Sequence, residues 1–470
     1  MEKLNVCLIN DSFPPAIDGV ANAVVNYARI INTRLGHASV VTPYYPDSDD
    51  AAFPFPVLRY PSLDTTRSVG YRAGIPFSAD IMHQVEQQSF DLIHTHCPIT
   101  STMLARSFRD RLNVPVILTY HTKFDIDIAN AVRGRLAQEE ATRLLVENIN
   151  ACDEVWTVSR GAGENLRKLG YRGSYTVMPN GVDFPRGRVS ESAAEKIGEG
   201  LDLPGGVPVF LFVGRMMWYK GIRIILDALK TLDEKAVPFR MVFVGGGSDL
   251  EEIRAYTEKL ALADKVFFVP PIRDREQIRA WYCRADVFLF PSSFDTNGLV
   301  VREAASCALG SVLIRGSCAA EDVEDGQSGV LIDENALSMA AALEELCAHP
   351  EAMRELGRRA QEELYMSWED AVYNAYQRYG AVIDSYKSGV YPTHQRFTDE
   401  VFAASAQLMD TFYRSRERQR RLMQEMEENR RRFSEEVNEQ RLRLERGLEQ
   451  EKAKMQETLE ELYQFMDRFL

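Results

Sequence analysis

The sequence has little of what stabilises a small secreted protein or anchors one in a membrane. Its 470 residues contain only seven cysteines, scattered and without a Cys-x-x-Cys pair, which disfavours a disulfide framework or a zinc site. No window approaches 18 consecutive apolar residues, so no membrane span is expected. The first residues form a strand-like run without a basic and apolar leader. We therefore expect a cytoplasmic protein with reduced thiols, whose membrane contact would be peripheral, at the inner face of the cell membrane.

Positive charge is also scarce. The chain has 55 Lys and Arg against 69 Asp and Glu, a formal net charge of −14. A protein that binds nucleic acid over its whole surface needs clustered cations to neutralise phosphates, so we expect no nucleic-acid partner. With 45% hydrophobic and 26% charged residues, the chain has the composition of an ordinary folded protein, and its length suits two or three domains.

Two stretches alternate short apolar runs with longer amphipathic ones, which is typical of parallel sheets wrapped by helices. The first covers residues 1–187 and the second residues 200–366, and a Ser-, Glu- and Gly-rich segment from about 190 to 206 is interpreted as the linker. We predict an α/β fold with two Rossmann-like domains that face each other across a cleft. Polar clusters follow several predicted strands, and ligands bind beyond the carboxyl ends of such strands, so the cleft is the candidate site.

Residues 396–470 have a different character. They are rich in Glu, Arg and Gln, without a proline and with the single glycine Gly447, which predicts one long helix. Apolar residues recur every eleven positions, about 3.67 per turn, as in a nearly straight or right-handed supercoil: Met426, Val437, Leu448 and Leu459, and also Phe433, Leu444, Met455 and Met466. We interpret the tail as a coiled coil that makes a homo-oligomer. There are two alternatives: a single helix exposed to solvent, or a helix whose Arg cluster within 418–432 contacts an anionic surface.

The strongest local signal is a pair of cations. A predicted strand over 209–213 ends at Gly214 and is followed by Arg215 and Lys220 before a predicted helix over 222–232. The dipole and the free amides at a helix N-terminus add to such charges, so the pattern suits a diphosphate. Two ordinary solvated cations are the alternative.

A second signal lies in residues 290–304. A strand ends at Pro291, Asp295 lies in a loop that Gly298 allows to turn tightly, and Glu303 falls in the opening turns of a helix. These two carboxylates could face one ligand from two sides, and a helix carboxylate can accept hydrogen bonds from ribose hydroxyls. A helix-terminal acid and a loop turn with no ligand are the alternative.

Together these motifs resemble those of the retaining, nucleotide-sugar-dependent glycosyltransferases of family 4. The segments that carry the resemblance occur in order along residues 3 to 387: 14–20, 119–122, 158–159, 179–183, 214–221 and 291–304. The resemblance implies a GT-B fold, transfer of a hexose with retention of its configuration, and no metal. It also implies a nucleotide-sugar co-substrate, most often a uridine diphosphate sugar, and no other cofactor. A helix over 367–388 resembles the one that returns to the first domain in this fold.

The resemblance also implies roles for particular residues. Arg215 and Lys220 would hold the donor diphosphate and stabilise the leaving group, while Glu303 would bind the donor ribose. Asp295 stands where the family usually has Glu, one methylene longer, and would lie by the donor sugar. The catalytic set is His121, Arg215, Lys220 and Asp295, and the donor-binding set is Gly19, Arg215, Lys220, Asp295, Gly298, Leu299 and Glu303.

The acceptor is less well defined. Residues 119–125 are similar to a stretch of bacterial diacylglycerol glucosyltransferases, whose acceptor is a membrane lipid. The helix that follows could lie on an anionic bilayer or be an ordinary amphipathic surface helix; it carries Arg133, Arg135 and Arg143 beside Ala131, Val132, Leu136, Leu144 and Leu145. A glycan or cell-wall precursor is the alternative acceptor.

Two other functions compete with hexosyl transfer. A sugar-nucleotide epimerase or hydrolase of similar shape would turn over the donor without an acceptor, but no obvious set of catalytic acids is present. The second competing function is a scaffold with a coiled tail and a vestigial cleft, and the intact Arg215, Lys220 and Glu303 count against it.

The pair His94-x-His96 has no evident third ligand, and Asp125-x-Asp127 is interpreted as charge at a helix start, so no metal site is predicted.

Overall fold

The structure is a computed structural model of the 470-residue chain. It describes residues 3–466 apart from residues 17, 67–71, 77, 126–127, 129–131, 133 and 392–396. The chain divides into two compact units, a body over residues 1–403 and a tail over residues 404–470.

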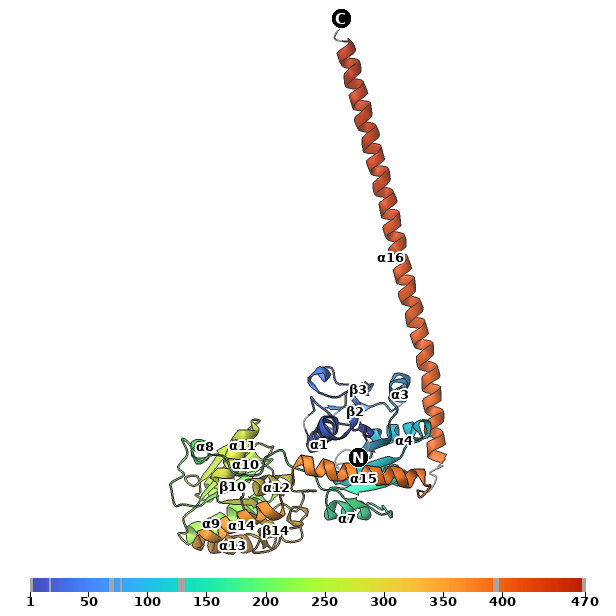
Figure 1. Cartoon of the computed structure of the whole chain (residues 1–470). Coiled ribbons are helices and arrows are strands. Elements are labelled where there is room, and N and C mark those ends of the chain that lie inside the picture. Colours follow the sequence, from blue (N-terminus) through green and yellow to red (C-terminus); the bar gives the residue numbers. More distant parts are fainter. Residues whose placement is uncertain are drawn as a thin grey trace. The chain divides into compact units, whose positions relative to one another are not determined.

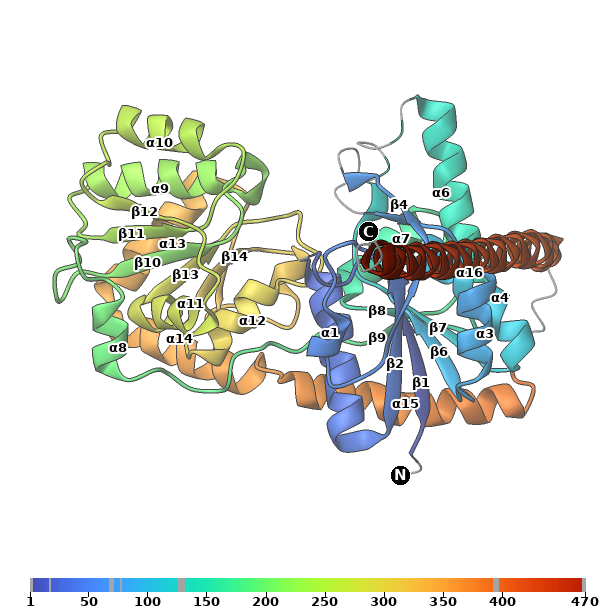
Figure 2. The same cartoon turned by 90° about the horizontal axis from the view of Figure 1, so that it is seen from above.

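The first domain of the body contains a seven-stranded parallel sheet in the order β3-β2-β1-β6-β7-β8-β9 (Figure 2). Its strands are β1 (Asn5–Ile9), β2 (His37–Pro43), β3 (Val57–Tyr60), β6 (Leu92–Thr95), β7 (Val116–Tyr120), β8 (Glu154–Thr157) and β9 (Thr176–Val177), with a small hairpin of β4 (Ser62–Leu63) and β5 (Ala73–Gly74) beside it. Its helices are α1 (Gly19–Ile30), continued by η1 (Ile31–Leu35), η2 (Asp50–Ala52), α3 (Ala79–Glu86), α4 (Thr100–Leu112), α6 (Arg135–Asn150) and α7 (Arg160–Lys168). The central strands are apolar on both faces because helices cover the sheet on both sides.

The second domain repeats this plan with a six-stranded parallel sheet in the order β12-β11-β10-β13-β14-β15. Its strands are β10 (Val209–Val213), β11 (Arg240–Val244), β12 (Val266–Val269), β13 (Val287–Phe290), β14 (Ser311–Ile314) and β15 (Val330–Ile332). Its helices are η3 (Trp218–Lys220), α9 (Ile222–Glu234), α10 (Leu250–Lys259), α11 (Arg275–Arg284), α12 (Leu299–Ser306), η4 (Cys318–Ala320), α13 (Ala336–Ala348) and α14 (Pro350–Glu363). Helix α9 packs through apolar residues at helical spacing, among them Ile222, Ile225 and Leu229, all fully buried. The predicted pair of Rossmann-like domains is confirmed.

The strand order reverses beside the first strand of each sheet. Strand β1 lies between β2 and β6, and β10 lies between β11 and β13. Ligands of doubly wound sheets bind at such reversal points, beyond the carboxyl ends of the strands. The fold therefore has one candidate site edge in each domain.

The segment interpreted as the linker contains a short helix. Ser190 caps helix α8 (Glu191–Lys196) by accepting a hydrogen bond from the Ala193 amide, and Ala194 is buried against the second domain. A serine cap and two consecutive alanines stabilise this short helix, which docks on the core of the second domain within the segment that joins the two domains.

Helix α15 (Trp368–Lys387) runs along the first domain after the chain leaves the second (Figures 1 and 2). The Tyr376 hydroxyl accepts a hydrogen bond of 2.7 Å from the Leu4 amide at the start of the first sheet. Tyr379 stacks on Trp156, with the ring centroids 5.5 Å apart. The end of the body thus completes the core of the domain with which the chain began.

The tail belongs to one continuous helix, α16 (Phe397–Met466), of 70 residues, which begins shortly before residue 404 (Figure 1). Its eleven-residue series are exposed wherever their side chains are described, as at Met426, Phe433, Val437 and Leu444. The side chain of Met466 lies outside the described residues. The predicted long helix is confirmed, while its coiled-coil pairing stays a prediction.

Candidate active site

A cavity of about 980 Å³ lies at the facing edges of the two domains. Residues that follow β1, β6 and β7 in the first domain line it, together with residues that follow β10 and β13 in the second. It is therefore built at the carboxyl ends of both parallel sheets, as the strand order requires. Predicted site residues that line it are His121, Gly19, Arg215, Lys220, Asp295, Gly298 and Leu299.

The second-domain wall contains a close ion pair. The Lys220 ammonium lies 2.9 Å from both carboxylate oxygens of Asp295, and both side chains are largely buried. Lys220 also lies over the Phe290 ring, 5.8 Å from its centroid. Arg215 lines the same wall and is exposed. The wall thus presents two cations and one carboxylate to the cavity.

The helix N-terminus on this wall is that of α12. Gly298 precedes α12 with φ of +55°, and a Cβ there would lie 2.8 Å from the Ala319 Cα, so both its conformation and its surroundings require glycine. Leu299 and Val300, in the first turn, line the cavity. In contrast, Ile222 at the start of α9 is fully buried in the domain core. The start of α9 is absent from the described residues that line the cavity, and its part in binding a diphosphate stays a prediction.

Glu303 is held by other side chains of the second domain. Its Oε1 lies 2.6 Å from the Arg275 guanidinium, and its Oε2 accepts a 3.0 Å hydrogen bond from the Tyr282 hydroxyl. Burial, and then the charge of Glu303, raise the pKa of Tyr282, so this phenol remains a donor. Glu303 is absent from the described residues that line the cavity. That Glu303 binds a donor ribose stays a prediction. The carboxylate would then have to accept hydrogen bonds from both the ribose and Arg275.

Neutral histidines form part of the first-domain wall. His121 Nε2 lies 3.0 Å from His96 Nδ1, and burial lowers the pKa of His121 to about 3. Burial also lowers the pKa values of His96 and His94 well below the ordinary range. His94 is held from both sides at 2.7 Å, by the Tyr379 hydroxyl of α15 and by the Thr119 hydroxyl. At neutral pH these rings can exchange hydrogen bonds but carry no charge.

Gly19 begins α1 at the rim of the cavity. Asp18 caps the helix by accepting hydrogen bonds of 2.8 and 2.7 Å from the amides of Val20 and Ala21. A Cβ at Gly19 would meet no protein atom within 4 Å. The packing of the protein itself therefore leaves room for a side chain at this position.

Sequence reasoning did not single out two polar residues of the cavity. Asp11 is 5% exposed; its Oδ1 accepts hydrogen bonds of 2.8 and 2.6 Å from the amide and hydroxyl of Ser101. Burial raises the pKa of Asp11, against the hydrogen bonds that its carboxylate accepts from Cys97, Thr100 and Ser101. The Asn297 Nδ2 is a buried atom with no hydrogen-bond partner within the described part of the chain. Asp11 belongs to a polar cluster that the sequence showed after the first strand, whereas nothing in the sequence distinguished Asn297 from its loop neighbours.

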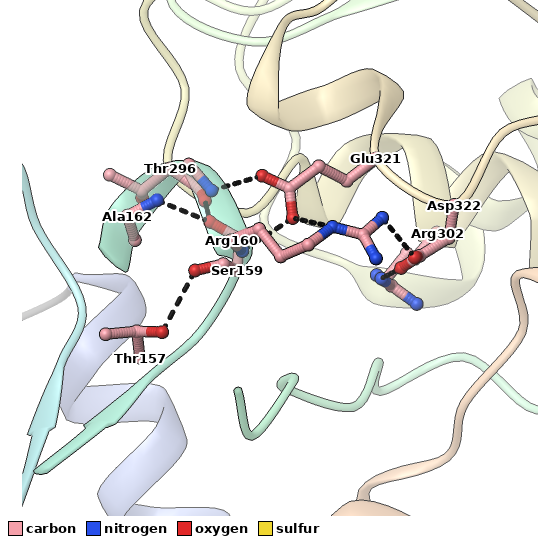
Figure 3. A network of polar contacts seen from close by, with 9 residues as sticks. Thr157, Ser159, Arg160, Ala162, Thr296, Arg302, Glu321 and Asp322 are labelled. Carbon is pink, nitrogen blue, oxygen red and sulfur yellow. Dashed lines mark hydrogen bonds and ion pairs between the residues drawn. The ribbon is translucent and has the colours of Figure 1, made fainter. Parts of the chain in front are cut away.

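A polar network joins the second-domain loop that carries Asp295 to helix α7 of the first domain (Figure 3). The Ser159 hydroxyl donates to the Thr296 carbonyl over 2.5 Å, and the Arg160 amide donates to Glu321 over 2.6 Å. The Arg160 guanidinium lies 2.9 Å from Asp322. A carboxylate from one domain thus caps a helix of the other, next to the loop that holds Asp295.

Helix α6 has its apolar side on the cavity. Leu144 and Leu145 line the cavity, whereas Leu136 is 82% exposed. Arg135 pairs with Glu139 at 2.8 Å, and Arg143 pairs with Glu140 and Glu147 on the same helix. The predicted neighbours Ala131 and Arg133, like Asp127, lie outside the described residues.

Within the described residues no helix is long and apolar enough to cross a membrane, and no cluster of three or more metal-ligating side chains occurs.

Comparison with known families matches both domains. The model for glycosyltransferase family 4 matches residues 17–186, and that for group 1 glycosyl transferases matches residues 194–363. The chain belongs to glycosyltransferase family 4. It is thus a member of a family of transferase enzymes, as its motifs predicted.

Curated relatives of this glycosyltransferase have several names. A D-inositol 3-phosphate glycosyltransferase of Xylanimonas cellulosilytica is 29% identical over 55% of this chain and 64% of its own length. A second of that name, from Catenulispora acidiphila, is 31% identical over 60% of this chain and 68% of its own. The alpha-monoglucosyldiacylglycerol synthase of Streptococcus pneumoniae is 24% identical over 64% of this chain and 69% of its own. The chain thus aligns with about two thirds of each relative.

Solved structures share the fold of the body. HepE of Anabaena, solved in complex with UDP and glucose, superposes with a TM-score of 0.61 at 18% identity over 81% of this chain and 100% of its own. At this identity the likeness establishes the two-domain fold and leaves ligand chemistry to the site itself.

Proposed function

We propose that the protein transfers a hexose from a UDP-sugar to a lipid or glycan acceptor, with retention of the anomeric configuration. The observation that carries this proposal is the second-domain wall, where Arg215, Lys220 and the first turn of α12 converge on one cavity. Two cations and a helix N-terminus are what a diphosphate needs. The bound UDP in a protein of the same fold supports uridine as the first base to test.

The roles follow from the placement of each group. Arg215 and Lys220 would bind the diphosphate and stabilise the charge that develops on it as the sugar leaves. Asp295, released from Lys220 by the diphosphate, would accept hydrogen bonds from the sugar. His121 would contact the sugar from the other domain as a neutral ring. The bond between the anomeric carbon and the diphosphate breaks, the acceptor oxygen bonds to the same face of that carbon, and the acceptor proton leaves with the diphosphate.

A thermal-shift experiment on the full chain tests the donor site. We expect UDP to raise the melting temperature more than GDP or ADP, equally with and without EDTA. Lys220→Ala and Glu303→Ala should weaken binding by about 10- to 100-fold, since a charge-assisted hydrogen bond contributes about 1.5–3 kcal/mol. The matched control is Lys235→Ala, because Lys235 pairs with Glu344 on the surface of the same domain.

Other outcomes favour the competing functions. If no nucleotide shifts the melting temperature, the scaffold hypothesis with a vestigial cleft takes first place. If the wild type binds UDP-sugar and releases the free or altered sugar without any acceptor, a hydrolase or epimerase is favoured.

We also propose that the tail pairs with a second copy of this chain as a coiled coil. Its eleven-residue apolar series remain exposed in a single chain, and such a stripe is covered when helices supercoil. A lipid acceptor would in addition require peripheral contact of the body with a membrane surface.

A further inference from the structure

His96, which follows strand β6, has one ring nitrogen without a hydrogen-bond partner. The residue is 2% exposed, and its ring packs against those of His94 and Tyr27, with centroid distances of 4.0 and 5.3 Å. Its Nδ1 lies 3.0 Å from the Nε2 of His121. Its Nε2 is a buried atom that has no hydrogen-bond partner within the described residues. The two nitrogens of the His96 ring thus have unequal surroundings.

This inequality selects one tautomer of the histidine pair. Burial keeps both rings neutral at pH 7, so each ring carries one proton on one of its two nitrogens. If the proton between the rings belonged to His121 Nε2, His96 would carry its own proton on Nε2, as a buried N–H group without an acceptor. Buried N–H groups almost always find an acceptor, whereas a lone pair is more often left without a donor. The proton between the rings therefore belongs to His96 Nδ1, and His121 Nε2 accepts the hydrogen bond.

The same hydrogen bond decides the state of His121 at the cavity. A neutral imidazole whose Nε2 accepts a hydrogen bond carries its proton on Nδ1. His121 lines the cavity, and its Nδ1 makes no hydrogen bond within the part of the chain that the structure describes. This nitrogen is therefore the one available to a ligand, and it presents an N–H group.

We propose that His96 is a positioning residue that fixes His121 as a hydrogen-bond donor toward the cavity, with the His121 proton on Nδ1. The group that accepts this hydrogen bond is an oxygen of the transferred sugar, so the inference rests on the proposed hexosyl transfer. The tautomer also limits what His121 does in the reaction. A nitrogen that already carries a proton cannot take one from the acceptor hydroxyl, which agrees with a proton that leaves with the diphosphate.

Magic-angle-spinning NMR of the full, ligand-free chain with 15N-labelled histidine rings measures where the protons lie. The chain has seven histidines, and spectra of the variants His121→Asn and His96→Leu identify the signals of the two rings. We expect Nδ1 of both rings to be protonated at pH 7.5 and Nε2 of both rings to be unprotonated. A proton on His121 Nε2 would overturn the proposal, whatever the protein does with nucleotides.

Two variants of matched design test the positioning role. His96→Asn keeps an N–H donor near the place of Nδ1, whereas His96→Leu fills a similar volume without a donor. Calorimetric titration of the full chain with UDP should give equal affinities for both variants and the wild type, which also shows that they are folded. UDP-glucose and UDP-galactose are titrated in parallel. His96→Leu should bind the UDP-hexose preferred by the wild type about fivefold more weakly, which is the loss of one neutral hydrogen bond, and His96→Asn should bind it as the wild type does.

The outcomes separate the positioning role from the proposed function. An equal loss of UDP-hexose affinity in both variants would show that His96 only packs in the wall, and an unchanged affinity in His96→Leu would show that His121 needs no positioning. Either result overturns the proposal while donor binding stands. If the wild type bound no UDP, the donor assignment would fail, and the NMR spectra would still decide which nitrogen of His121 carries the proton.

Discussion

Residues far apart in the chain form the contacts that define the cavity. Lys220 and Asp295 are 75 residues apart and form a two-oxygen ion pair at 2.9 Å. His96 and His121 are 25 residues apart and share a hydrogen bond of 3.0 Å. The ion pair neutralises the Lys220 ammonium, which is proposed to bind the donor diphosphate, so donor binding would exchange one anion for another. The histidine pair, in contrast, stays neutral through burial.

This burial predicts a pH dependence of stability at the residue scale. The native histidines 94, 96 and 121 stay neutral because their pKa values are lowered, to about 3 for His121, whereas in the unfolded chain they titrate near 6.5. The unfolded state therefore binds more protons below pH 6.5, so stability present above that pH is lost as the pH falls towards the folded values. Between pH 7.5 and 5.5 each histidine should remove about 1.4 kcal/mol from the free energy of unfolding of the first domain.

Urea unfolding at the two pH values, followed by tryptophan fluorescence, measures this loss. His121→Asn should reduce the loss by about one third of the histidine contribution, and His37→Asn, at an exposed position on β2, should leave it unchanged. Burial raises the pKa of Asp11, which acts in the opposite direction at lower pH. An identical pH dependence in the wild type and in His121→Asn would contradict the assignment.

At the element scale, helix α7 is capped across the domain boundary. The Glu321 carboxylate accepts hydrogen bonds from the amides of both Arg160 and Gly161, and a negative charge at a helix N-terminus is favourable. At the same helix start, the Ser159 hydroxyl donates a hydrogen bond to the Thr296 carbonyl, in the loop that carries Asp295 (Figure 3). The position of the loop that carries Asp295 is therefore coupled to the first domain, as closure over a donor would require.

Removing this cap should loosen α7 without disturbing the second domain. Glu321→Ala should raise the rate of amide hydrogen exchange at Arg160 and Gly161 by about fivefold, since losing a cap costs about 1 kcal/mol. The measurement is hydrogen exchange followed by mass spectrometry on the full, ligand-free chain. Glu324→Ala is the control, because Glu324 bonds to Gln327 within its own domain. Equal exchange in both variants would show that the cap does not hold the helix.

At the scale of the whole molecule, the body and the tail differ in whether their apolar residues are buried. The body buries its apolar residues in cores that the sheets and helices share, and helix α15 adds Trp368 and Tyr379 to the first-domain core. The tail has a single helix whose apolar residues are exposed along its described length. A helix of 70 residues with such a stripe gains little from its own chain and needs a partner to bury it.

Deleting residues 392–470 should therefore abolish self-association and leave donor binding intact. Light scattering coupled to size-exclusion chromatography should give an oligomer for the full chain and a monomer for the shortened one. The UDP thermal shift should be equal in both. An unchanged oligomer after the deletion would exclude the tail as the assembly element.

The amino-acid pattern predicted the two α/β domains, most strand positions, the tail helix and a few of the residues that line the cavity, among them Arg215, Lys220 and Asp295, while the resemblance to a known family added His121 and Gly19. It could do so because helical and strand periodicity, strand ends and glycine-bearing loops are local properties of the chain. Short edge strands such as β3 and β9, and the helix α8, escaped notice because only their docking on a finished core stabilises them.

Only the tertiary structure decided which side chains meet. It paired Lys220 with Asp295, paired Glu303 with Arg275 and Tyr282, and placed the first turn of α12 at the cavity. These properties depend on desolvation and on contacts between residues distant in the chain, which arise when the two sheets bring their carboxyl ends together.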